Sequence, residues 1–193
     1  KLFNWWDMGH ILTFLTERKV STDNRNLIGS GNIGMAKFVT TEDVNLAYTI
    51  ADQNIGADYV VLDTSMFYRE LTFKFYDIGK VDYSHPDLQK YREGPINIIN
   101  CGNQGDIVVC GGNRFTKEQF NAIPAEWTSV PTQFYNGQYP MYIYRSDNSL
   151  IVLNDAVNKS NLAKVWLHAD STEKYYEEVF YNGTVKILKI LDQ

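Results

Sequence analysis

The side chains best suited to chemistry lie within the first ten residues. Trp5, Trp6 and Asp7 follow one another, and Gly9 stands two positions further on. An ionised aspartate only accepts hydrogen bonds, whereas an indole nitrogen only donates one. A hydroxyl group does both, so a Trp beside an Asp can satisfy both sides of one hydroxyl. Such a site rejects a ligand without the hydroxyl, because its own buried polar groups would then be left unpaired.

The same string carries a family resemblance. Tryptophan is scarce and no regular secondary structure calls for two in a row, so the pattern Trp-Trp-Asp-x-Gly at residues 5–9 is a rare one. It resembles the Trp-Trp-Asp-Tyr-Gly signature of oligosaccharyltransferase catalytic subunits, and it departs from that signature at Met8. The resemblance implies that Trp5, Trp6 and Asp7 form the pocket for the Ser or Thr hydroxyl of an Asn-x-Ser/Thr sequon.

A second, shorter similarity involves Asp63 and Met66. The family carries an Asp-x-x-Lys arrangement near the start of a helix, with Met in place of Lys in some members, and these two residues have that spacing. The resemblance implies that both side chains lie near the hydroxyamino acid of the bound sequon, where an unbranched, polarizable Met suits a threonine methyl group. The structural alternative is that Asp63 caps a helix and Met66 packs in the core.

The resemblance also implies a larger parent protein. In the family, the signature follows the last membrane helix and opens a globular domain on the extracytoplasmic side, and the abrupt start at Lys1 fits that arrangement. We expect this domain to hold the acceptor polypeptide, while the membrane portion binds the lipid-linked oligosaccharide and a Mg²⁺ or Mn²⁺ ion. We therefore expect no catalytic residue and no metal ligand in residues 1–193, no transferase activity for this segment alone, and, from its short length, an archaeal parent.

Other functions also fit parts of the pattern. Aromatic residues make up 14% of the sequence, and exposed Trp and Tyr on β-hairpins would suit a carbohydrate-binding module. In that case Trp5 and Trp6 would form a flat exposed platform instead of lining a polar pocket with Asp7. An interaction domain without ligand chemistry is a third possibility. Without any function, the string would be a chance pair of core tryptophans beside a turn aspartate.

Composition restricts the class of protein. Hydrophobic residues make up 44% and charged residues 21% of 193 residues, which is typical of a folded chain with one domain-sized core. The net charge is −5 and Arg18 with Lys19 is the only adjacent basic pair, which excludes nucleic acid as a partner. No apolar stretch approaches the roughly 20 residues that a membrane helix needs.

The sequence predicts an α/β arrangement for residues 41–76, the segments that would position the motifs. Residues 41–56 have apolar side chains at helical spacing, with Thr40 or Thr41 as a possible cap and Gly56 as a stop. A short continuous apolar run at residues 59–62 predicts a strand buried on both faces. A second helix, capped by the oxygens of residues 63–65, is expected to continue to about residue 76.

The rest of the chain reads as β-rich. After a connection over residues 77–95, the pattern predicts short strands, one hairpin around a polar turn, and a final hairpin with a type I′ turn at Asn182-Gly183. These segments are residues 96–101, 107–110, 141–153 and 178–191. We therefore predict a mixed α+β fold in a single domain spanning residues 1–193, with an α/β core at residues 1–76 and a β-hairpin-rich part at residues 77–193.

The two cysteines leave two possibilities open. Cys101 and Cys110 flank a turn-prone stretch at residues 102–105. They form a disulfide across a hairpin if the compartment is oxidising and their Cα atoms come within about 7 Å, or they remain free in the core. A zinc site is not expected, because no second Cys or His pair has the required spacing.

Overall fold

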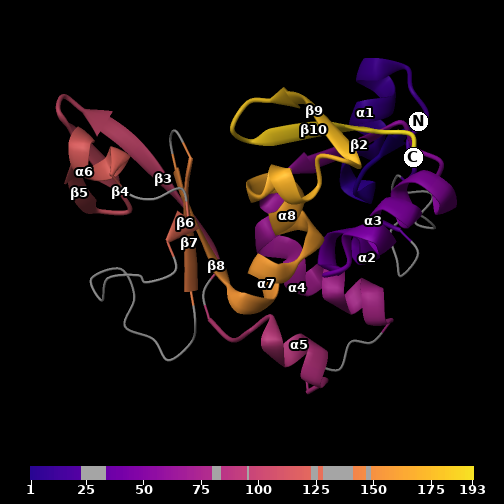
Figure 1. The fold of residues 1–193 in the computed structure, drawn as a ribbon, viewed down its shortest axis with the longest axis horizontal. Coiled ribbons are helices and arrows are strands. Elements are labelled where there is room, and N and C mark those ends of the chain that lie inside the picture. The colour runs from indigo at the N-terminus through magenta and orange to yellow at the C-terminus, as the bar shows by residue number, and fades with distance from the viewer. Residues whose placement is uncertain (23–33, 80–83, 95, 123–125, 128–140, 147–148) are drawn as a thin grey trace. The chain divides into compact units, whose positions relative to one another are not determined.

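The computed structural model describes residues 1–22, 34–79, 84–94, 96–122, 126–127, 141–146 and 149–193. The chain divides into two compact units, of which the first combines residues 1–89 with residues 159–193 and the second spans residues 90–158 (Figure 1). The predicted mixed α+β fold is confirmed. The sequence predicted two parts that meet at residue 76. The two units of the structure are divided differently, because residues 159–193 pack with residues 1–89.

A four-stranded sheet forms the centre of the first unit. Its strand order is β1 (Leu2–Phe3), β2 (Tyr59–Asp63), β10 (Val185–Ile190) and β9 (Tyr176–Tyr181). β1 runs parallel to β2, and the other neighbours are antiparallel. Val60, Val61 and Leu62 are all buried, which confirms the predicted strand with two buried faces.

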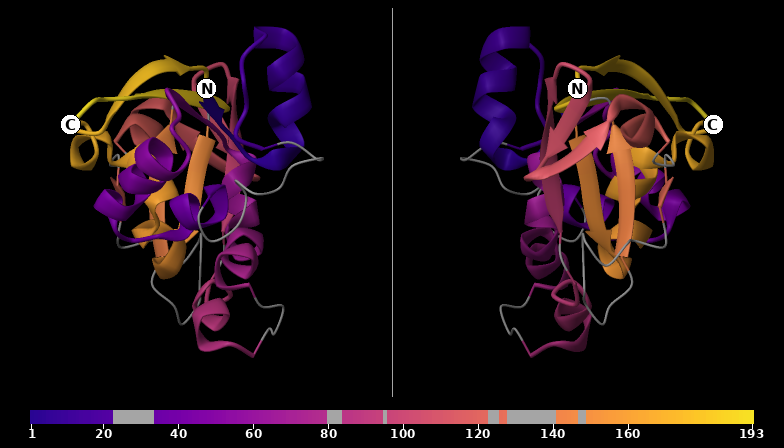
Figure 2. Two further views of the ribbon diagram at one scale, coloured as in Figure 1. Left: turned by 90° about the vertical axis from the view of Figure 1, so that its right-hand side faces the viewer. Right: turned by 90° about the vertical axis from the view of Figure 1, so that its left-hand side faces the viewer.

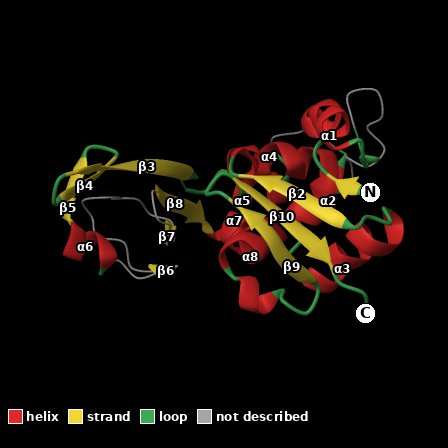
Figure 3. Cartoon of the chain, turned by 90° about the horizontal axis from the view of Figure 1, so that it is seen from above, coloured by secondary structure: helices red, strands yellow, loops and turns green. Residues whose placement is uncertain are grey.

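Helices pack beneath one face of this sheet (Figures 1 and 3). The helices of the first unit, whether or not they belong to this layer, are α1 (Gly9–Thr16), α2 (Met35–Thr40), α3 (Val44–Thr49), α4 (Ser65–Ile78), α5 (Pro86–Lys90) and α8 (Asn161–Leu167), with short turns of helix at Trp6–Met8 (η1), Ile50–Asn54 and Ala169–Ser171. α1 stands apart from the helical layer, as the indigo helix in Figure 2 shows. Both predicted helices are confirmed, as α3 with its continuation and as α4.

The start of α3 differs from the predicted one. The side chain of Asp43, and neither Thr40 nor Thr41, caps the helix, because its Oδ1 accepts hydrogen bonds from the backbone N–H groups of Asn45 and Leu46 at 2.9 and 3.2 Å. After the helix, Gly56 adopts a φ of +60°, a left-handed conformation that favours glycine.

The second unit is built on a six-stranded antiparallel sheet. Its order is β5 (Asn113–Thr116), β4 (Ile107–Cys110), β3 (Asn97–Gln104), β8 (Ser149–Asn154), β7 (Met141–Ser146) and β6 (Glu126–Trp127), with helices α6 (Lys117–Asn121) and α7 (Asp155–Lys159). The strands predicted at residues 96–101 and 107–110 and the hairpin at 141–153 are confirmed. Side chains of Val108, Phe120, Ile143 and Leu150 fill the core of this unit.

The final hairpin forms as predicted, but it belongs to the first sheet. β10 pairs with β2 on one side and with β9 on the other. The turn is not the type I′ turn predicted at Asn182-Gly183. Asn182 and Val185 flank it, with Asn182 N donating to Val185 O at 3.2 Å, and of the two central residues only Gly183 has a positive φ, of 86°. A positive φ at the first central position alone is a feature of type II′ turns.

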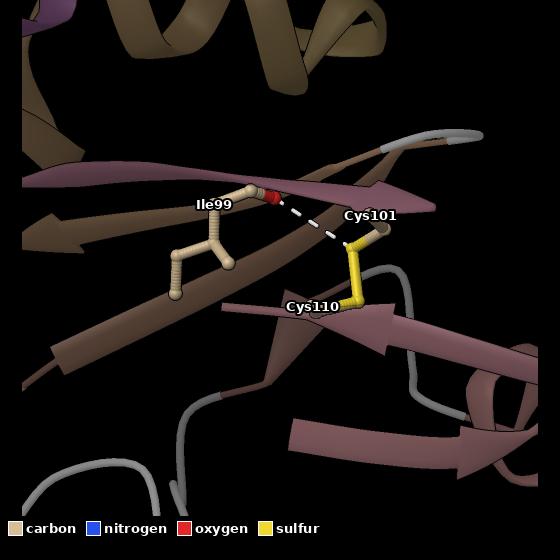
Figure 4. Close-up of a disulfide and its surroundings, with 3 residues drawn as sticks. All are labelled: Ile99, Cys101 and Cys110. Atoms are coloured by element: carbon tan, nitrogen blue, oxygen red, sulfur yellow. Dashed lines mark hydrogen bonds between the residues drawn. A yellow bond between two sulfur atoms is a disulfide. The ribbon is translucent and has the colours of Figure 1, made fainter. Parts of the chain in front are cut away.

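A disulfide joins the two cysteines, so the first of the two possibilities left open by the sequence holds (Figure 4). Cys101 on β3 lies directly opposite Cys110 on β4, and their Cα atoms are 4.2 Å apart. The Cys110 side chain is fully buried in the core of the second unit. The bond therefore fixes the register of the β3–β4 hairpin where it contacts that core.

Removing this disulfide should destabilise the second unit. The bond closes a loop between residues nine positions apart, and a loop of that length reduces the entropy of the unfolded chain enough to contribute about 2–3 kcal/mol. We expect the Cys101→Ala/Cys110→Ala variant to lose about that much unfolding free energy in equilibrium denaturant titrations. The wild-type chain treated with reductant is the matched control, and it should unfold like the variant. Equal stability of all three samples would contradict the prediction.

Candidate functional site

The two sequence motifs follow the carboxyl ends of two neighbouring strands of the first sheet. β1 and β2 are parallel, with Leu2 opposite Tyr59 and Phe3 opposite Val60, so both strands end toward the same edge. The chain leaves β1 into residues 4–8 and leaves β2 into the start of α4. Ligand sites in sheets with parallel strands commonly lie outside the carboxyl ends of those strands.

Asn4 holds the start of the motif in place. Its side chain is fully buried, and its amide nitrogen donates to the backbone oxygens of Trp5 at 2.7 Å and Thr22 at 3.0 Å. Its backbone N–H donates to the Ser21 hydroxyl at 3.2 Å. These bonds tie the segment after β1 to residues 21 and 22, so the backbone that leads to Asp7 has a fixed path.

Trp5 is a buried packing residue. Only 3% of its surface is exposed, and its ring meets Phe73 of α4 edge to face, with centroids 4.5 Å apart and planes at 83°. A sugar-stacking platform needs an exposed ring face, so this burial removes Trp5 from the carbohydrate-binding alternative. The side chain of Trp6 lies outside the described part of the structure.

Asp7 is the member of the motif with a described, solvent-accessible polar group. It lies in η1 (Trp6–Met8), and its side chain is 32% exposed. Its Oδ2 accepts a hydrogen bond from Nη1 of Arg69, which projects from α4 and is 41% exposed. The pair forms a charge-assisted contact between the motif and α4. A carboxylate in this position accepts hydrogen bonds from solvent or from a ligand.

The second motif agrees in part with the structural alternative, because Met66 packs in the core but the N-cap residue of α4 is Thr64 and not Asp63. The Oδ1 of Asp63 accepts a hydrogen bond from the backbone N–H of Ser65 at 2.8 Å and so stabilises the start of α4. Met66, one residue further, is fully buried. Thr64 is tied to the β9–β10 turn, because its N–H donates to the oxygen of Thr184 at 2.9 Å. A direct contact of Asp63 or Met66 with a sequon stays a prediction.

One face of α4 joins the motifs. Met66, Arg69 and Phe73 lie three and four residues apart, so they share one face of the helix. Phe73 packs on Trp5 and Arg69 pairs with Asp7. Sequence reasoning had not assigned Phe73, Arg69 or Asn4 to the site. The helical spacing of residues 66, 69 and 73 indicated that they share one face. It did not indicate that this face packs against the segment from Trp5 to Asp7.

The cavity found in the first unit lies away from the two motifs. A cavity of about 550 Å³ opens at the opposite edge of the sheet, beside Asp58 and Tyr59 at the start of β2 and Ile190 at the end of β10. It contains none of the motif residues. Within the described ranges, no three His, Cys, Asp or Glu side chains gather as metal ligands do, and no helix there is long and apolar enough to span a membrane.

The first third of the chain is similar to a known protein family. Residues 1–67 match the family model AglB_core-like, described as the AglB core domain. This segment is similar to an AglB core. The matched segment contains both sequence motifs, from Trp5 to Asp7 and from Asp63 to Met66, and it ends two residues before Arg69. A search of curated proteins found no significant match.

Solved structures show the fold of the whole chain. The C-terminal domain of C. jejuni PglB aligns with 99% of this chain and 93% of its own length, at 12% identity and a TM-score of 0.54. The C-terminal globular domain of a Pyrococcus abyssi oligosaccharyltransferase covers 98% of this chain at 11% identity and a TM-score of 0.53, although this chain spans only 46% of it. The corresponding Archaeoglobus fulgidus domain has 15% identity and a TM-score of 0.46, with 98% and 84% coverage.

The family resemblance drawn from Trp5 to Gly9 is therefore confirmed. Residues 1–67 match the AglB core model, and the fold of the whole chain is similar to that of the C-terminal domain of C. jejuni PglB. An archaeal, short-form parent stays a prediction.

Proposed function

We propose that this domain recognises the acceptor sequon, Asn-x-Ser/Thr, for an oligosaccharyltransferase that transfers glycan from a lipid-linked donor to asparagine. The observation that carries the proposal is the accessible Asp7 carboxylate, held within the AglB core at the carboxyl ends of β1 and β2. Asn4 fixes the backbone before it, and Arg69 pairs with one of its oxygens.

The chemistry of the site suits a hydroxyl group. The sequon's Ser or Thr hydroxyl would donate to the Asp7 carboxylate, and a charge-assisted bond of this kind is about twice as strong as a neutral one. The indole N–H of Trp6 would donate to the hydroxyl oxygen. In the described structure Trp5 is buried against Phe73, so its main role would be to fix the position of its neighbours. An acceptor without the hydroxyl leaves the carboxylate without its ligand and binds more weakly.

The remaining steps of transfer would belong to the membrane portion of the parent enzyme. An amide nitrogen is a weak nucleophile, so the enzyme has to hold the acceptor and polarise the amide near a divalent metal. That ion would be Mg²⁺ or Mn²⁺, and its ligands would lie outside this chain. The domain alone should bind acceptor without transferring glycan.

The disulfide supports an extracytoplasmic location for the domain. Bonds such as Cys101–Cys110 persist mainly in oxidising compartments, and we propose that the domain lies on the outer side of the membrane, where acceptor polypeptides emerge. The deciding test of sequon recognition is the transfer activity of the parent enzyme with Asp7→Ala, which should be far below that of the wild type.

A further inference from the structure

We propose that Arg69 is a positioning residue that orients the Asp7 carboxylate for the sequon hydroxyl. The inference rests on the proposed function and adds to it a residue beyond the AglB core match. Arg69 lies on α4 and reaches the motif with its guanidinium group, whose Nη1 donates to Oδ2 of Asp7.

Buried side chains hold α4, the helix that carries Arg69, in place. Phe73, one turn further along the same face of α4, is fully buried against Trp5, and Met66, one turn before it, is also fully buried. Asp77 near the end of α4 adds a further anchor, because its carboxylate lies 2.9 Å from Lys74 and 3.4 Å from Lys37 of α2. The helix that carries Arg69 is therefore fixed at several points along its length.

The pairing leaves the carboxylate able to bind a ligand. A carboxylate has two oxygens and about four acceptor positions, so a single N–H donor on Oδ2 occupies only part of its capacity. Among the described residues, Arg69 is the side chain with which Asp7 forms an ion pair. A guanidinium bound to one oxygen restricts rotation of the carboxylate. Such preorganisation strengthens binding because less side-chain freedom is lost when the ligand arrives.

This role can be separated from a purely structural one. Both partners are about one-third to two-fifths exposed, and ion pairs of that exposure contribute little to folding stability. Replacing Arg69 should therefore leave the protein folded. Its effect should appear in the binding of acceptor peptide, as a change in KM rather than in kcat.

The experiment compares variants of the full-length parent enzyme on an Asn-x-Thr peptide. For Arg69→Gln we expect KM to rise roughly 10-fold, with kcat unchanged within about twofold and the Tm within about 3 °C of wild type. Arg69→Lys, which keeps the charge, should recover part of the loss. In Asp7→Asn, adding Arg69→Gln should cost no more than about twofold in kcat/KM, because the two residues act as one unit. Arg114→Gln, an exposed arginine in the second unit, is the matched control and should behave as wild type.

The possible results distinguish this inference from the function on which it rests. Normal turnover of Asp7→Asn and Asp7→Ala would reject sequon recognition by Asp7 itself. A large loss with Asp7→Ala but wild-type kinetics for Arg69→Gln would leave sequon recognition intact and overturn the role of Arg69. A loss confined to kcat, or one that multiplies fully with Asp7→Asn, would also overturn it.

Discussion

Replacing Asp7 with alanine in the full-length parent enzyme should lower kcat/KM for an Asn-x-Thr peptide by at least about 100-fold. The carboxylate is 32% exposed and is the described polar group at the end of the signature. Alanine removes the acceptor for the sequon hydroxyl and leaves the Arg69 guanidinium without its partner. Because the pair is partly exposed, the loss should come from peptide recognition and not from unfolding. Transfer to peptide, measured alongside the Tm of each protein, checks this.

Two further variants test whether the loss comes from the Asp7 carboxylate. Asp7→Asn keeps an acceptor oxygen but loses the charge, so its activity should fall between those of wild type and Asp7→Ala. Asp106→Ala changes an exposed aspartate in the second unit and should leave transfer unchanged. Near-normal turnover of Asp7→Ala would make the Trp-Trp-Asp string a coincidence with respect to sequon binding, despite the family model that residues 1–67 match.

The second large effect is expected at Phe73. This side chain is fully buried and meets Trp5 edge to face at 4.5 Å. Phe73→Ala removes a ring from the core and leaves a cavity under the signature, which should lower the unfolding free energy by about 3–5 kcal/mol. Equilibrium denaturant unfolding of the chain measures this loss.

Phe73→Leu is the matched control for that variant. Leucine fills most of the volume, so we expect a loss below about 2 kcal/mol. In the parent enzyme, the Leu variant should remain folded, but Trp5 loses its edge-to-face partner. We therefore expect the KM for the acceptor peptide to rise while kcat stays close to that of the wild type. A loss below about 1 kcal/mol for Phe73→Ala would show that the site relaxes around the missing ring and that Trp5 does not depend on it.

Local pattern accounts for the elements that were predicted correctly. The apolar run at residues 59–62 has buried side chains on both faces, which only a strand inside a covered sheet provides. The helix that becomes α4 follows from its apolar spacing and from Asp63, whose carboxylate binds the Ser65 N–H. Apolar spacing and helix capping depend only on residues close together in the chain. The sequence by itself therefore contains all the information needed to recognise them.

Strand pairing over long distances was not predictable in the same way. The β9–β10 hairpin was expected from its sequence, but its insertion beside β2, more than a hundred residues away in the chain, was not. Pairing of this kind depends on which apolar faces are buried together, and a local pattern does not specify the partner. For the same reason, the predicted parts of 1–76 and 77–193 differ from the two units that the contacts form.

The sequence alone indicated the family resemblance, because a Trp-Trp-Asp string is rare, and it indicated which groups of the motif can donate or accept hydrogen bonds. Only the tertiary structure decided which of these side chains are accessible. It buried Trp5 against Phe73 and left Asp7 in contact with both solvent and Arg69. Accessibility depends on how α4 packs on the segment after β1, and residues 62 positions apart in the chain meet only when the sheet has formed.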